Sequence, residues 1–136
     1  MAMPDVYDEM FKYAKSYIVQ KSQYAPKVLK DTPPDNKFPL IIIKQIRDDL
    51  YSENLDKTDQ RFYLGYEIDI YTINKSNIAK QTIASELKKL LNDIFDEHYG
   101  MNRKFNQQTP NVDTDVYRWT MRFESKIDEN KRIYRR

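Results

Sequence analysis

Hydrophobic residues recur at two different spacings along the chain, and these spacings predict its secondary structure. Near the N-terminus the spacing is three to four residues, which predicts an amphipathic helix over residues 5–21 with Val6, Met10, Tyr13, Ala14, Tyr17 and Ile18 on its buried face. A second stripe of this kind predicts a helix over residues 74–99. Ser76 or Asn77 would cap its start, and Gly100 follows its end, where glycine is common.

Alternation of hydrophobic and polar residues predicts strands. The clearest strand is Phe62–Ile73, in which one face would be buried (Phe62, Leu64, Tyr66, Ile68, Ile70) and the other would not (Tyr63, Gly65, Glu67, Asp69, Tyr71). Gly65 would mark a bulge or a close backbone approach. Val116–Ile127 alternates in the same way, with Tyr117, Trp119, Met121 and Phe123 on one side. Three consecutive isoleucines in Phe38–Ile46 favour a strand buried on both faces. A further short strand is predicted over Arg103–Gln108.

The remaining segments are polar and are predicted as loops. Residues 22–37 hold three prolines, and residues 47–61 hold five acidic side chains. The predicted order is therefore α-β-β-α-β-β, which favours an α+β fold: a mostly antiparallel four-stranded sheet with two helices packed on it. We expect residues 1–127 to form a single domain and residues 128–136 to form a basic, mobile C-terminal tail.

The composition excludes several kinds of catalytic and ligand-binding site. The 136 residues include no Cys, one His and two Gly, which excludes thiol catalysis, Cys-ligated zinc and glycine-rich phosphate loops. The formal net charge of +2 is too small for the basic footprint of a duplex-binding protein. No segment approaches the ~18 apolar residues of a membrane span, and the N-terminal residues do not have the pattern of a secretory signal. We therefore expect no cofactor, no metal, no enzymatic activity and no membrane contact, in a protein made and kept in a cytoplasm.

Four stretches of the sequence resemble a known family: Phe38–Lys44, Tyr66–Tyr71, Ile78–Phe95 and Asn111–Glu124. In these stretches the chain resembles the tail terminator proteins of long-tailed bacteriophages, also described as tail completion or tail-to-head joining proteins. The resemblance spans residues 1–127. In the last stretch Phe123 stands where the family more often has Tyr.

The resemblance implies a structural role in virion assembly. Proteins of this family form a ring, usually a hexamer, at the head-proximal end of the tail tube. The ring stops tube polymerisation and joins the tail to the head. The implied partners are other copies of the chain, the tail tube protein and the head connector protein, and the implied location is the virion, after assembly in the cytoplasm of a host bacterium. DNA would pass through the lumen without specific binding, which suits a nearly neutral chain with acidic loops.

Charged residues of the polar loop and of the strands are candidates for contacts between copies: Arg47, Asp48, Asp49, Arg61, Glu67, Asp69, Arg118 and Arg122. Glu67 and Asp69 could reach arginines of a neighbouring copy. The competing interpretation is that they pair with Arg118 and Arg122 inside one sheet. Eleven tyrosines also favour interfaces, and Tyr63 and Tyr71 are predicted on a face left free for partners.

Other functions are also compatible with the sequence. One is a small Mg²⁺-dependent nuclease using Asp113, Asp115, Glu124 and Lys126, although the two aspartates equally favour a simple turn. Another is a different head–tail connector or minor capsid component. Trp119 and the tyrosines could stack single-stranded bases, with a core role as the competing interpretation. His98 suits the C-terminal end of a helix.

Overall fold

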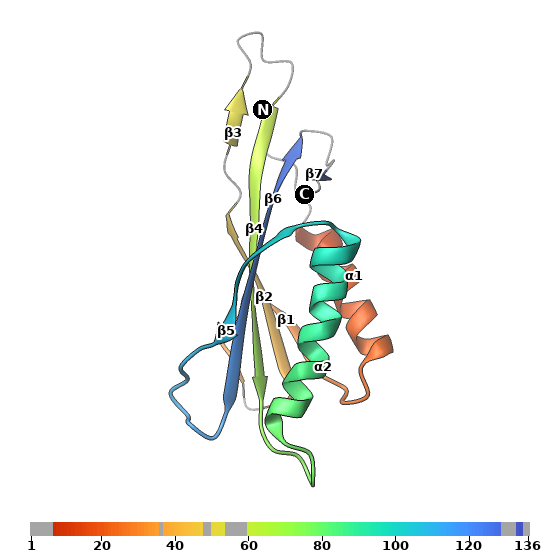
Figure 1. Ribbon diagram of the computed structural model, residues 1–136, viewed down its shortest axis with the longest axis vertical. Helices are drawn as coiled ribbons and strands as arrows, with labels where there is room; N and C mark the ends of the chain where they lie inside the picture. The colour runs from red at the N-terminus through yellow and green to blue at the C-terminus, as the bar shows by residue number, and fades with distance from the viewer. Residues whose placement is uncertain (1–6, 36, 48–49, 54–59, 129–132, 135–136) are drawn as a thin grey trace.

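The computed structural model describes residues 7–35, 37–47, 50–53, 60–128 and 133–134. Two helical segments lie on one face of a long sheet (Figure 1). The elements, in chain order, are α1 (Tyr7–Lys21), β1 (Lys27–Lys30), β2 (Leu40–Arg47), β3 (Leu50–Glu53), β4 (Gln60–Thr72), α2 (Lys80–Asn92), the π-helix η1 (Asp93–His98), β5 (Asn102–Gln108), β6 (Tyr117–Asp128) and β7 (Ile133–Tyr134). The predicted α+β class is confirmed.

The sheet is mixed, so the predicted four-stranded, mostly antiparallel sheet is wrong in detail. Its main strand order is β1-β2-β4-β6-β5, with β3 paired to β4 and β7 paired to β6. β1 runs parallel to β2, and the other pairs are antiparallel. The observed order of elements therefore also differs from α-β-β-α-β-β.

β1 lies inside the segment that was predicted as a loop. Its four residues are too few to show alternation, and Pro26 directly precedes it. Parallel neighbours usually need a crossover of about a dozen residues or more. Here the nine residues between Lys30 and Leu40 are enough, because they return along only four strand residues, a length of about 13 Å.

Two further short strands occupy segments predicted to be irregular. β3 lies within residues 47–61 and pairs with the start of β4, and β7 lies within the predicted tail and pairs with Lys126 and Ile127. Both were missed because two to four residues carry no recognisable period. The charged composition of these segments also favoured a loop or a tail.

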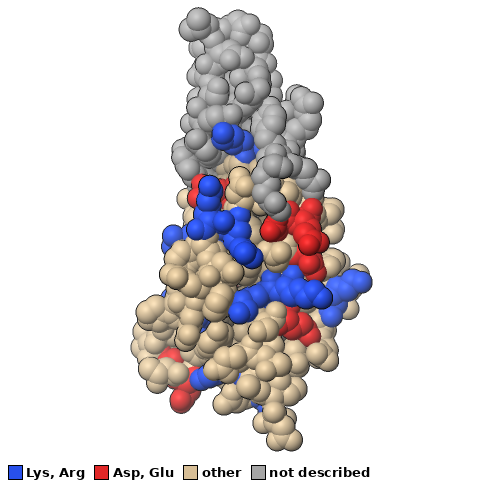
Figure 2. Space-filling view, in the orientation of Figure 1, with Lys and Arg blue, Asp and Glu red and all other residues tan. Residues whose placement is uncertain are grey.

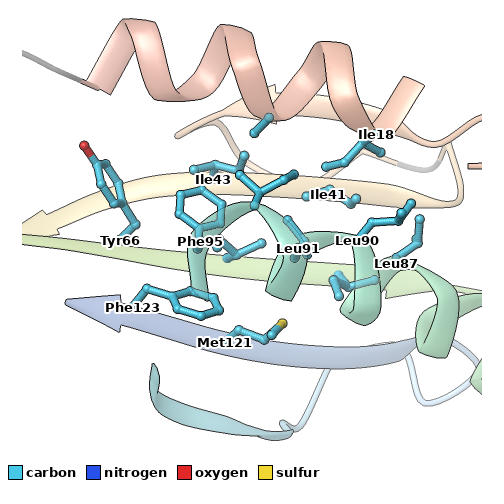
Figure 3. Close-up of a cluster of buried hydrophobic side chains, with 14 of the residues drawn as sticks. Ile18, Ile41, Ile43, Tyr66, Leu87, Leu90, Leu91, Phe95, Met121 and Phe123 are labelled. Atoms are coloured by element: carbon cyan, nitrogen blue, oxygen red, sulfur yellow. The ribbon is translucent and has the colours of Figure 1, made fainter. Parts of the chain in front are cut away.

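The core lies between the helices and one face of the sheet (Figure 3). Met10, Ala14 and Ile18 follow each other at four-residue intervals on α1, as predicted, and are buried. The long helical stripe of α2 and η1 contributes Ile83, Leu87, Leu91 and Phe95, and β4 contributes Leu64, Tyr66, Ile68 and Ile70. The predicted inner face of β4 is thus confirmed for the residues whose side chains are described.

The second helix is shorter at its start than predicted. Residues 74–79 form a tight turn, with a bridge between Lys75 and Ile78 and a positive φ at Ser76. α2 begins at Lys80, whose backbone N–H donates to the side-chain oxygen of Asn74. The cap is therefore Asn74 acting from six residues away, and the predicted caps Ser76 and Asn77 are wrong. At the other end Gly100 has a φ of 66°, which confirms the predicted glycine stop.

A bulge interrupts the pairing of β2 and β4. Gln45 lies opposite Tyr66 and Arg47 lies opposite Gly65, so Ile46 is the extra residue, and its side chain is exposed. The predicted bulge at Gly65 is therefore present, with the inserted residue on the neighbouring strand.

Candidate interaction surfaces

The face of the sheet opposite the helices carries four of the predicted interaction residues, and they pair with one another inside the sheet. Glu67 lies directly opposite Arg122 in the β4–β6 register. The Arg122 Nε donates to Glu67 Oε1 at 2.8 Å. The Glu67 side chain is 14% exposed and the Arg122 side chain is 45% exposed, so this pair lies at the surface of the face.

Asp69 forms the buried counterpart of that pair. The Arg118 Nε donates to Asp69 Oδ1 at 3.1 Å, and the Thr120 hydroxyl donates to the same oxygen at 2.6 Å. Asp69 is fully buried, whereas the Arg118 side chain is 28% exposed. Partial burial lowers the pKa of Arg118, but the hydrogen bond and the charge of Asp69 outweigh it, so the pKa is raised above its usual value. The pair is part of the sheet's own structure.

Several groups hold this arrangement in place. The Arg118 guanidinium also donates to the carbonyl of Pro110 and lies over the Tyr71 ring. The Thr109 and Thr120 hydroxyls are hydrogen-bonded to each other at 2.7 Å. Among the described residues, Asp69 Oδ2 has no hydrogen-bond partner. Pairing inside one sheet is therefore what the structure shows for these carboxylates.

An apolar corner covers the remaining part of this face. Leu40, Ile42, Tyr71 and Val116 are buried there, with Leu29 and Phe38 packed against them. Ile42 faces this corner while its neighbours Ile41 and Ile43 face the helices, which confirms that this strand is buried on both sides. Tyr71 is only 5% exposed, so the prediction that it faces partners is wrong. Burial raises the pKa of its hydroxyl.

Two of the other predicted interaction residues, Arg47 and Arg61, lie at one end of the sheet. Arg47 ends β2, and Arg61 pairs through its backbone with Ser52 of β3 and with Asp128 of β6. Asp48 and Asp49 lie outside the described residues, and so does the side chain of Tyr63. For Arg47 and Arg61 the structure describes the backbone alone, so their contacts with other copies stay a prediction.

Strand β5 forms an edge of the sheet, which the sequence pattern did not reveal. Six of its seven residues are exposed and Phe105 is half-buried beneath the guanidinium of Arg122. Its first half carries Arg103 and Lys104 and a bulge, features that discourage pairing with another chain. Its second half, Asn106–Gln108, is uncharged and regular. An edge is set by strand order, so one strand's sequence gives little sign of it.

The helix side of β5 and β6 carries a second exposed area. Met121 and Phe123 belong to the core as predicted, whereas Tyr117 and Trp119 are only half-buried and pack against it. The Lys88 ammonium lies 3.6 Å from the centroid of the Trp119 ring. The Trp119 indole N–H donates to the Asn106 side chain at 2.7 Å.

The end of the second helix carries the chain's one histidine. The rings of His98 and Tyr13 are stacked with their centroids 4.3 Å apart, and Tyr99 meets both rings edge-on. Burial is the main cause that raises the pKa of Tyr99, to about 12. His98 lies in the last turn of η1, as predicted, and its ring is used for packing.

The residues of the nuclease alternative do not converge. The Asp113 carboxylate accepts from the backbone N–H of Asp115, so both belong to a turn ahead of β6. Glu124 lies seven strand residues beyond Tyr117, about 23 Å away. Within the described part of the chain, no three His, Cys, Asp or Glu side chains form a group able to hold a metal ion. In the same residues, no helix is both long and apolar enough to cross a membrane.

Comparisons with known proteins find similar structures and no similar sequence family. No family model matches the sequence, and no curated protein matches it. A chain from the virion of a native gene transfer agent particle has a similar structure, with a TM-score of 0.44 and 12% sequence identity, over 74% of this chain and 78% of that chain. A similarity of this degree carries no argument about function.

Proposed function

We propose that this chain is a structural component of a phage-type virion, and within that class a tail terminator. In this role copies of the chain form a ring, a hexamer, on the head-proximal end of the tail tube. The ring stops tube polymerisation and binds the head connector, and it acts by contact and not by catalysis. The sequence resemblance in the β2, β4, α2 and β6 regions supports the family.

The observation that best supports assembly is the exposed edge of β5. The uncharged second half of this strand has backbone groups on its outer side that no described strand pairs. Such an edge is a template for a strand of another copy. A ring needs contacts between two different patches, and an edge that meets another surface of the next copy is a contact of that kind.

The backbone geometry indicates how to test the edge. The Thr109 N–H donates to the Arg118 carbonyl, so the N–H of Gln107 points inwards and those of Asn106 and Gln108 point outwards. Gln108→Pro removes an outward donor and leaves the bonds to β6 in place. We expect Gln108→Pro to reduce assembly sharply while Gln107→Ala, the matched control, assembles normally. Light scattering gives the mass, and thermal unfolding checks that both variants fold.

The expected assembled mass is about six times the 16.4 kDa of one chain, alone or on tail tubes. Deleting the gene from its phage should give tails of irregular length that lack heads. Tails of normal length joined to heads would refute the tail terminator, whatever the mass in solution. Normal-length tails without heads would instead identify a different head–tail connector.

A further inference from the structure

The helix side of β5 and β6 carries a second surface, next to the edge of β5. We call it the β5–β6 shelf and define it by Lys88, Arg103, Asn106, Tyr117 and Trp119. Lys88 belongs to α2, and the other four belong to the two strands. On this side of β6, Met121 and Phe123 are buried in the core, whereas Tyr117 and Trp119 are half-exposed.

Two flat rings form the centre of the shelf. The rings of Tyr117 and Trp119 lie with their centroids 6.3 Å apart and their planes 25° apart. The hydrogen bond from the Trp119 indole to Asn106 fixes the orientation of the larger ring. A pair of fixed, nearly parallel rings is a platform on which other flat rings can stack.

Among the described residues, no carboxylate forms a salt bridge with the two cations of the shelf. Lys88 forms no ion pair with any described acid, and burial lowers the pKa of its ammonium. Arg103 donates to Asn92, which is neutral. Gln81, Ser85 and Asn92 share the helix face of Lys88 and are uncharged.

Both signs of charge occur around the shelf. Figure 2 shows Lys and Arg side chains over the start of β5 and over α2, and it also shows Asp and Glu side chains over α2 and η1. Asp113 and Asp115 are the acidic residues closest in sequence to the two rings. They lie in the turn that precedes β6. An anion that binds directly at the two rings, Lys88 and Arg103 meets cations and amides.

We propose that the β5–β6 shelf binds single-stranded nucleic acid. Bases stack on Trp119 and Tyr117, and phosphates bind Lys88 and Arg103. The flexible side chain of Lys88 exchanges the indole face for a phosphate, which frees that face for a base. An acidic peptide would satisfy the cations but would leave the two rings without flat partners, so the rings favour nucleic acid. This inference does not depend on the ring.

The chain's one tryptophan, Trp119, makes the site directly observable. Adding a short oligothymidylate to the purified chain should quench its tryptophan fluorescence to saturation. An abasic oligonucleotide with the same number of phosphates should bind about tenfold more weakly or worse. A lack of quenching, or equal affinity for the abasic strand or for an acidic peptide, would overturn the proposal.

Variants separate the two contributions. Lys88→Ala should reduce the slope of log affinity against log salt by about 0.7, the value for one phosphate contact on a single strand. Lys89→Ala changes the exposed neighbour on the same helix and should leave the slope unchanged. Trp119→Phe should retain binding of a labelled oligonucleotide, and Trp119→Ala should weaken it about tenfold. If Lys88→Ala and Lys89→Ala have equal effects, the shelf is not the site.

Discussion

The two faces of the sheet are buried by different means. On the helix side, β2 and β4 pack Ile41, Ile43, Ile68 and Ile70 against α1 and α2. On the other side no described helix covers the sheet, yet Ile42 and Asp69 are fully buried. There the cover has three parts. One is the side chain of Phe38, which lies in a short loop, and the others are the ring of Tyr71 and the guanidinium of Arg118. Burial on this second face therefore depends on polar pairing as well as on apolar packing.

The difference can be tested most strongly at two adjacent residues of β2. Ile43 faces the helices and Ile42 faces the apolar corner, and each is at most 1% exposed. Replacing a buried Ile by Ala usually costs about 2–5 kcal/mol. We expect Ile43→Ala near the upper end of that range and Ile42→Ala near the lower end, because a loop can settle into a cavity more readily than packed helices can. Urea unfolding measures both.

Equal losses for the two variants would contradict this view of the faces. The corner would then be packed as rigidly as the main core. A change in the urea dependence of one variant alone would point to an altered native or unfolded state, and that variant would have to be excluded from the comparison.

The next largest effect is expected at the buried ion pair. Arg118→Ala leaves Asp69 buried without its charge partner, which should cost about 3 kcal/mol. Asp69→Ala leaves Arg118, which can still reach water, so the cost should be smaller, about 2 kcal/mol. Thermal and urea unfolding of both variants, with the double variant, give the order and the coupling. An Asp69→Ala variant that is less stable than Arg118→Ala would contradict the role given to burial.

The smallest effect is expected at the exposed pair of the same face. Glu67 and Arg122 should be coupled by about 0.2–1 kcal/mol, and the coupling should weaken as salt is added. A double-mutant cycle at low and high salt measures it. A coupling as large and as salt-independent as that of Asp69 and Arg118 would show that exposure does not distinguish the two pairs.

The sequence predicted the parts of the fold that have long, regular patterns. The alternation over β4 predicts a strand, and the four-residue intervals of α1 and α2 predict helices. Each of these periods places many side chains on one face, so the pattern is easily recognised. β1, β3 and β7 are too short to show a period. The cap at Asn74 was missed because a six-residue turn separates it from the helix it caps.

The site could be predicted only in part for a similar reason. The sequence shows the opposite charges of β4 and β6 and is compatible with their pairing inside one sheet or between copies. The burial of Asp69 and Tyr71 depends on loop 31–39 and on Arg118, which no local pattern reveals. The position of β5 at an edge and the partial exposure of Trp119 depend on strand order and on tertiary packing, which one strand's sequence does not contain.

The single parallel pair has a consequence for how the sheet could be extended. In a sheet of five strands that were all antiparallel, the two outermost strands would point the same way. Because β1 is parallel to β2, the outermost strands β1 and β5 point in opposite directions. A second copy displaced sideways without being turned over would therefore place its β1 antiparallel to the first copy's β5. The small strand that the sequence did not reveal sets the polarity of every such junction.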